Sequence, residues 1–117
     1  IFIIGQIETV RSVENIDEIL SSDGLDAIFI GPYDLSTSMG ISGQLDHPRI
    51  VESIEKVIAK AKERRTILGS YVNDFETGEH WINDGVQMFA CGNDAFLVTC
   101  RFAEVNQKFK NAFQEVS

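Results

Sequence analysis

Four short apolar runs alternate along the chain with four segments of helical periodicity, and this alternation sets the fold class. Every run is apolar at consecutive positions, which is typical of strands that are buried on both faces. The strands are expected over residues 1–7, 25–30, 66–71 and 86–91. Such strands, each followed by a helix, indicate an α/β fold with a parallel sheet. The order is equally compatible with a (β/α) barrel and with a doubly wound sheet.

The segments between the runs carry apolar residues at helical spacing. Helices are expected over residues 12–21, from Pro48 onward, over 76–83, and from Asn93 or Asp94 onward. Residues 31–46 are rich in glycine and small hydroxyl residues and are expected to form a long loop. A faint repeat aligns "SDGLDAIFIG" (22–31) with "NDGVQMFACG" (83–92), and each copy places Asp-Gly at a turn from helix to strand.

Composition excludes several classes of partner. The 117 residues suffice for one domain, 1–117, and the contents of 44% hydrophobic and 24% charged residues are ordinary for a globular protein. The net charge of −8 argues against binding to nucleic acid or to an anionic membrane surface. No apolar run is long enough for a membrane span. Cys91 and Cys100 support neither a zinc site nor a disulfide framework, and we expect buried, reduced thiols in a cytoplasmic protein.

Polar side chains follow every apolar run, at the edge of the sheet where α/β proteins carry their functional groups. They are Gln6 and Glu8 after the first run, Asp34 after the second, Asn73 or Asp74 after the third, and Asn93 or Asp94 after the fourth. The acids after the third and fourth runs are most simply helix caps.

Glu8 and Asp34 are the pair of polar residues most suited to a chemical function. They lie 26 residues apart, which is one βα unit. If their strands are neighbours, the strand axes lie roughly 5 Å apart, and two converging carboxylates repel each other unless a cation lies between them. Mg²⁺ or Mn²⁺ suits two carboxylates with open positions. From spacing alone, two acids that cap helices or face solvent remain the simpler interpretation.

Three segments together resemble the HpcH/HpaI aldolase family. They are "QIET" (6–9), "GLDAIFIGPYDLSTSMG" (24–40) and "HP" (47–48). The combination of "QIE" with "GPYDLS" and "SMG" is more specific than any of these motifs alone. The region after residue 66 matches the family only in its general succession of helix, glycine and strand. The resemblance implies a (β/α)₈ TIM barrel, and the four βα units of this chain would form its C-terminal half.

The resemblance also implies an activity. Members are class II aldolases, in which a divalent metal assists the cleavage of a 4-hydroxy-2-oxo acid into pyruvate and an aldehyde. By resemblance, Glu8 and Asp34 would hold Mg²⁺, Mn²⁺ or Co²⁺, which acts as a Lewis acid. Gln6 would hydrogen-bond the substrate, and Gly31, Pro32 and Tyr33 would shape the pocket beside it.

The resemblance does not assign every catalytic role of the family to a residue of this chain. The family's catalytic histidine and arginine belong to the N-terminal half, so no catalytic residue is assigned here and the chain alone is expected to be inactive. We expect a longer enzyme, which is a homo-oligomer with its last helices either exchanged between subunits or packed on their own barrel. The alternatives are a citryl-CoA-lyase-like or phosphoenolpyruvate-utilising barrel enzyme, and a non-catalytic half-barrel that only oligomerises.

Overall fold

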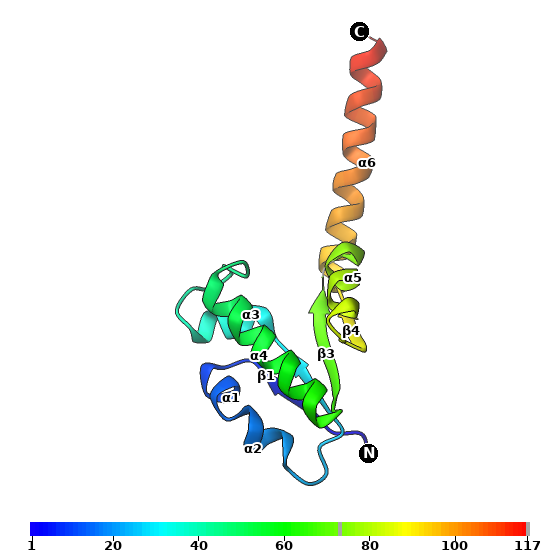
Figure 1. Ribbon diagram of the computed structural model, residues 1–117. Coiled ribbons are helices and arrows are strands. Elements are labelled where there is room, and N and C mark those ends of the chain that lie inside the picture. The colour runs from blue at the N-terminus through cyan, green and yellow to red at the C-terminus, as the bar shows by residue number, and fades with distance from the viewer. Residues whose placement is uncertain (73, 117) are drawn as a thin grey trace.

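A single four-stranded sheet runs through the computed structural model, which describes residues 1–72 and 74–116 (Figure 1). Its strands are β1 (Ile4–Ile7), β2 (Ala27–Ile30), β3 (Ile67–Val72) and β4 (Met88–Cys91). They stand in the order β1-β2-β3-β4, and every neighbouring pair is parallel. A doubly wound sheet reverses its strand order at a switch point. The sequential order seen here therefore belongs to a segment of a (β/α) barrel, and the α/β class is confirmed.

Six helices accompany the strands. They are α1 (Val10–Glu14), α2 (Ile16–Leu20), α3 (Pro32–Ser38), α4 (Pro48–Arg64), α5 (Phe75–Asn83) and α6 (Asp94–Val116). The single helix expected over 12–21 is wrong, because Asn15 leaves the helical conformation (φ −95°, ψ 20°) and divides the segment into α1 and α2. The long loop expected over 31–46 is also wrong, because α3 occupies its first half.

Helix α3 forms from residues that usually favour turns. Pro32 is its first residue, where the absent N–H costs nothing and the fixed φ suits a helix. The hydroxyls of Ser36 and Thr37 donate back to the carbonyl oxygen of Tyr33, at 2.6 and 3.2 Å. These bonds lie within the helix, so both hydroxyl groups are satisfied without ending α3.

Helix α4 is the longest element of the core and agrees with its prediction. The Nδ1 atom of His47 accepts a hydrogen bond from the backbone N–H of Arg49 at 3.2 Å, and Pro48 follows as the first helical residue. One face is buried, and it consists of Ile50, Ile54, Val57, Ile58 and Ala61. The helix ends at Arg65 in the left-handed conformation (φ 56°).

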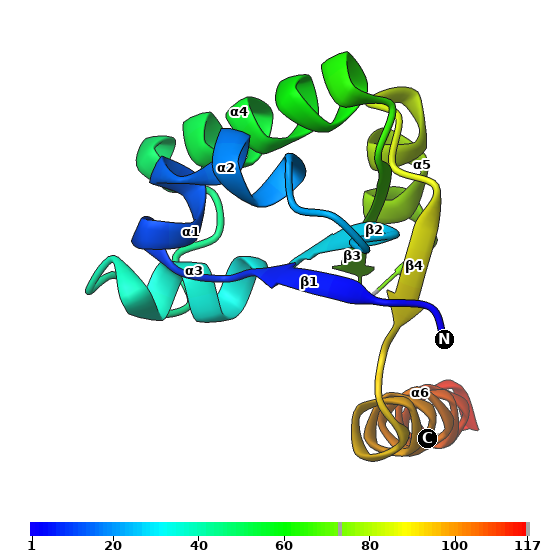
Figure 2. The same ribbon diagram turned by 90° about the horizontal axis from the view of Figure 1, so that it is seen from below.

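The helices cover one face of the sheet. The strands contribute Ile7, Ile28, Ile30 and Leu68 to a buried cluster that also contains the inner residues of α1, α2 and α4. Figure 2 shows α2 and α4 side by side over this face. The salt bridge between Lys60 and Asp17, at 2.9 Å, joins the two helices at their surface.

The opposite face of the sheet is open along the described part of the chain. Gln6, Phe29, Gly69 and Met88 lie in register across the four strands on this face. A Cβ on Gly69 would lie only 2.6 Å from the Phe29 ring and 2.7 Å from Cε of Met88, so these two side chains close over the glycine. Large residues packed over a small one are what the interior of a (β/α) barrel requires.

Helix α6 departs from the rest of the molecule. It extends away from the sheet and brings the longest dimension to 65 Å (Figure 1). Phe102 and Phe109 on this helix are 73% and 61% exposed. Cys91 and Cys100 are both free and exposed, so the prediction of buried thiols is wrong. The reason is that α6 does not fold back over the end of β4.

Candidate functional site

The candidate site lies at the carboxyl ends of β1 and β2, which are neighbours in the sheet. Gln6 pairs with Phe29, and Ile7 pairs with Ile30, so the residues that follow each strand lie at the same edge. Because side chains alternate along a strand, Gln6 and Glu8 both belong to the open face. Glu8 follows β1 directly and is half-buried, whereas Gln6 is exposed.

The carboxylates of Glu8 and Asp34 converge on Gly31. A Cβ placed on this glycine would lie 3.2 Å from Cβ of Glu8, 3.5 Å from its Oε2 and 3.7 Å from Oδ2 of Asp34. The two carboxylate oxygens therefore face the same small space, which any other residue at position 31 would fill. Asp34 reaches this space from the first turn of α3.

Two hydrogen bonds join α3 to the segment that carries Glu8. The backbone N–H of Gly31 donates to the carbonyl oxygen of Ile7 at 3.1 Å. At the other end of the helix, the backbone N–H of Val10 donates to Oγ of Ser38 at 3.1 Å. A second serine, Ser36, is fully buried, and its Oγ accepts from the N–H of Gly43 at 2.8 Å, which holds the following loop against α3.

The donor set suits a hard divalent cation. Two carboxylates with unfilled space between them can supply oxygen ligands and leave positions for water or for a substrate, as Mg²⁺ and Mn²⁺ require. Within the described residues, no group of three or more histidine, cysteine, aspartate or glutamate side chains is arranged to hold a metal. A cation at this position would therefore have only Glu8 and Asp34 as charged ligands from this chain.

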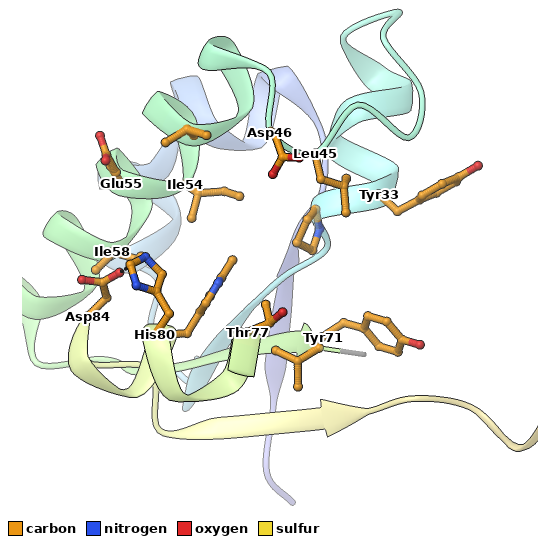
Figure 3. A pocket seen from close by; sticks show the side chains of 14 residues that line it. Tyr33, Leu45, Asp46, Ile54, Glu55, Ile58, Tyr71, Thr77, His80 and Asp84 are labelled. Carbon is orange, nitrogen blue, oxygen red and sulfur yellow. Dashed lines mark ion pairs between the residues drawn. The ribbon is translucent and has the colours of Figure 1, made fainter. Parts of the chain in front are cut away.

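The side chains of Pro32 and Tyr33 face a different cavity. It has a volume of about 600 Å³ and lies between α4 and α5, and neither Glu8 nor Asp34 lines it (Figure 3). Tyr33 and Tyr71 stand at one end, while His80 of α5 and Asp84, the residue after this helix, stand opposite Glu55 of α4 (Figure 3). Pro32 and Tyr33 thus adjoin the carboxylate pair only through their backbone.

Of the acids after the third and fourth strands, Asp74 caps a helix as predicted, whereas Asp94 is already the first residue of α6 and the amide of Asn93 makes the capping bond instead. Asp74 accepts a hydrogen bond from the N–H of Thr77 at 2.8 Å, and the bonds from Thr77 lower the pKa of the Asp74 carboxyl. Asn93 accepts from the N–H of Phe96 at 2.8 Å at the start of α6. Asn73, the other candidate after the third strand, lies outside the described residues.

Sequence reasoning missed Ser36 and Ser38. Both belong to the stretch "STS", which was assigned to a loop. Hydroxyl residues are common in loops and predict no particular contact there. The relevant signal would have been Pro32 followed by polar residues, which is compatible with a helix that begins directly after the strand.

Residues 1–100 match the family described as HpcH/HpaI aldolase/citrate lyase. A 5-keto-4-deoxy-D-glucarate aldolase from Citrobacter koseri is 30% identical over 115 residues, which are 98% of this chain and 43% of the relative. A 4-hydroxy-2-oxo-heptane-1,7-dioate aldolase from Shigella flexneri is 30% identical over 110 residues, or 94% of this chain and 41% of the relative. The chain thus spans less than half the length of these curated relatives.

A solved structure of an HpcH/HpaI aldolase is also similar to this chain. The crystal structure of an HpcH/HpaI aldolase from Desulfitobacterium hafniense DCB-2 superposes with a TM-score of 0.84 and 36% sequence identity. The superposition covers 94% of this chain and 43% of that structure. The matched aldolases have the TIM-barrel fold, so the four βα units described here correspond to about half of such a barrel.

Proposed function

The chain belongs to the HpcH/HpaI aldolase/citrate lyase family, and on this premise we propose that it forms the metal-binding part of an aldolase that releases pyruvate from a 4-hydroxy-2-oxo acid. The names of its relatives, which are aldolases of two such substrates, support the reaction class. The observation that carries the proposal is the convergence of the Glu8 and Asp34 carboxylates on the Cβ position of Gly31.

Each residue at this site has a defined task in the proposed reaction. Glu8 and Asp34 hold the divalent cation, which supplies Lewis-acid stabilisation of the negative charge that develops on the substrate. Gln6, exposed two positions before Glu8 on the open face, donates a hydrogen bond to a substrate oxygen. The backbone N–H groups of Tyr33 and Asp34 lie in the first turn of α3, where a helix has no internal acceptor for them, and they bind the substrate carboxylate.

Proton transfer is assigned to groups outside this chain. Neither histidine stands near the carboxylate pair in the fold: His47 caps α4, and His80 pairs with Asp84 on α5 at 3.5 Å. The proposed enzyme is therefore the longer protein, in which further residues complete the site.

The test is an assay of pyruvate release by the intact protein. Chelator-treated protein is expected to be inactive on 4-hydroxy-2-oxoheptane-1,7-dioate and 5-keto-4-deoxyglucarate, and added Mg²⁺, Mn²⁺ or Co²⁺ should restore activity. Asp34→Asn, which keeps the shape of the side chain but removes its charge, should lower kcat/KM by at least about a hundredfold, since ligand loss removes the electrostatic stabilisation. Full activity in metal-free protein, or in the Asp34→Asn variant, would contradict the proposal.

A second candidate is a lyase that acts on an acyl-CoA ester, because the family description also includes citrate lyase. The same carboxylate pair would serve that reaction. Turnover of citryl-CoA, with no turnover of free 4-hydroxy-2-oxo acids, would favour this candidate over the aldolase.

We also propose that the protein is a cytoplasmic homo-oligomer. The support for self-association is the exposure of Phe102 and Phe109 on α6, since phenylalanines are rarely left this exposed in pairs on one helix face. The support for a reducing compartment is that Cys91 and Cys100 are both free. No helix in the described ranges is long and apolar enough to cross a membrane.

A further inference from the structure

We propose that Ser38 is a positioning residue that sets the separation of the Glu8 and Asp34 carboxylates. The inference rests on the proposed function, because it assumes that these carboxylates hold a divalent cation. It concerns a residue that makes no contact with the cation and acts only through the backbone.

The bond that Ser38 makes satisfies a donor that would otherwise have no partner in its helix. Val10 is the first residue of α1, and the N–H groups in the first turn of a helix lack an internal acceptor. Thr9 caps the N–H of Ser12 with its own hydroxyl, at 3.1 Å. The N–H of Val10 instead donates to Oγ of Ser38, 28 residues along the chain. Ser38 thus caps α1 from a different helix.

The two residues joined by this bond lie close in sequence to the two carboxylates. Val10 is two residues after Glu8, and Ser38 is four residues, or about one helical turn, after Asp34. The second connection, from the N–H of Gly31 to the carbonyl oxygen of Ile7, lies on the other side of both acids. Because α3 is a short helix that moves as a unit, bonds at its two ends fix Asp34 relative to Glu8 in both distance and direction.

Neighbouring hydroxyl groups do not make this connection. Ser36 joins α3 to the following loop through the N–H of Gly43. Thr37 bonds the carbonyl oxygen of Tyr33 and the hydroxyl of Ser42, which are both within α3 and its loop. Within "STS", Ser38 is the residue whose hydroxyl reaches the β1–α1 turn. Without it, the bond from Gly31 to Ile7 is left as the connection described here between α3 and the segment that carries Glu8, and α3 can rotate about it, which shifts Asp34 relative to Glu8.

The experiment measures Mn²⁺ binding to the intact protein by electron paramagnetic resonance, with Tm measured in the absence of metal. Ser38→Ala should raise the Kd for Mn²⁺ about three- to tenfold, the range expected for the loss of one hydrogen bond. Ser38→Thr keeps the hydroxyl and should bind Mn²⁺ as the unaltered protein does. Ser42→Ala is the matched control, because it removes an exposed hydroxyl of the same region that does not reach the β1–α1 turn.

The outcomes separate this inference from the proposed function. If Asp34→Asn binds Mn²⁺ as tightly as the unaltered protein, or if neither binds, the proposed metal site fails. If Asp34→Asn loses Mn²⁺ but Ser38→Ala retains the full affinity, the metal site stands and the role of Ser38 is refuted. A lower Tm for Ser38→Ala with unchanged affinity of the folded protein would likewise refute it, because that is the signature of a merely structural serine. Restored affinity in Ser38→Thr supports the inference even if Ser38→Ala is less stable.

Discussion

At the scale of single residues, two glycines matter because each leaves a space that a side chain would occupy. Gly31 leaves open the space into which Glu8 and Asp34 point, and Gly69 leaves room for Phe29 and Met88 to meet on the open face. The family resemblance implied that Gly31 helps to shape the pocket, but the sequence offered no reason to single out Gly69. Contacts across neighbouring strands depend on the register, which a single sequence does not specify.

Gly31→Ala should weaken metal binding without unfolding the protein. The added methyl group would lie 3.2 Å from Cβ of Glu8, so Glu8 must shift by a few tenths of an ångström, and the methyl group would take up space beside Oδ2 of Asp34 at a contact distance of 3.7 Å. We expect a Kd for Mn²⁺ about tenfold higher or more, measured by titration calorimetry. Gly78→Ala is the control, because its methyl group would meet only Val72, at 3.8 Å. Equal Mn²⁺ affinity in Gly31→Ala would show that no cation occupies this space.

Gly69→Ala should destabilise the intact protein by about 1–3 kcal/mol, the usual cost of overpacking. Its methyl group cannot fit between Phe29 and Met88 unless one of them moves. The measurement is urea unfolding followed by far-ultraviolet circular dichroism. Introducing Gly69→Ala into a Met88→Ala background should cost less than in the unaltered protein. Equal costs in both backgrounds would contradict the close packing of these two residues.

At the scale of elements, apolar periodicity predicted the four strands and α4, and β2, β3 and α4 do bury a continuous face or run. The expected burial on both faces is wrong for β1 and β4, whose residues are mostly exposed or half-buried. The periodicity failed at α1 and α2, where Asn15 interrupts an otherwise regular pattern. It failed again at α3, because short helices stabilised by hydroxyl groups lack an apolar stripe. The Asp-Gly repeat was a better guide, since Gly24 and Gly85 both have the positive φ that its two helix-to-strand turns require.

The salt bridge between α2 and α4 should make a small contribution to stability that depends on pH. The hydrogen bond from Lys60 lowers the pKa of the Asp17 carboxyl below its ordinary value of 3.8, and the same bond raises the pKa of Lys60 above 10.5. The contribution is therefore fully present between these two values. It is lost as the pH falls through the lowered pKa of Asp17 or rises through the raised pKa of Lys60.

Asp17→Asn tests this contribution. It should lower the Tm at pH 7 by at most a few °C, since Asp17 is exposed, Lys60 is only half-buried and water screens the pair. At a pH well below 3.8 the variant and the unaltered protein should melt together. A Tm difference that persists in acid would mean that Asp17 acts through packing rather than through its charge.

At the scale of the whole molecule, the strand order identifies a barrel segment, and α6 stands apart from it. The sequence predicted the apolar face of α6 but not its direction. An amphipathic helix has the same pattern whether it packs on its own sheet or on another subunit. The exposure of Phe102 and Phe109 favours the second arrangement.

Under the proposed self-association through α6, Phe102→Glu should reduce the oligomer to a smaller species. A charge in the centre of an apolar contact cannot be buried without a large penalty. Sedimentation velocity of the intact protein should show the change in mass. Gln107→Glu introduces the same group on the polar side of α6 and should leave the oligomer intact. Identical sedimentation of both variants would place the subunit contact elsewhere.

The sequential order of the strands also has a consequence for how the chain acquires its structure. Every strand pairs with the next one along the chain, so each βα unit can add to the growing sheet without waiting for a distant segment. The widest separation to be bridged lies between β2 and β3, where α3, its loop and α4 intervene. Closing that interval costs the most chain entropy. Helix α4, with its capped start and continuous apolar face, occupies 17 residues of that interval and shortens the distance over which the chain must close.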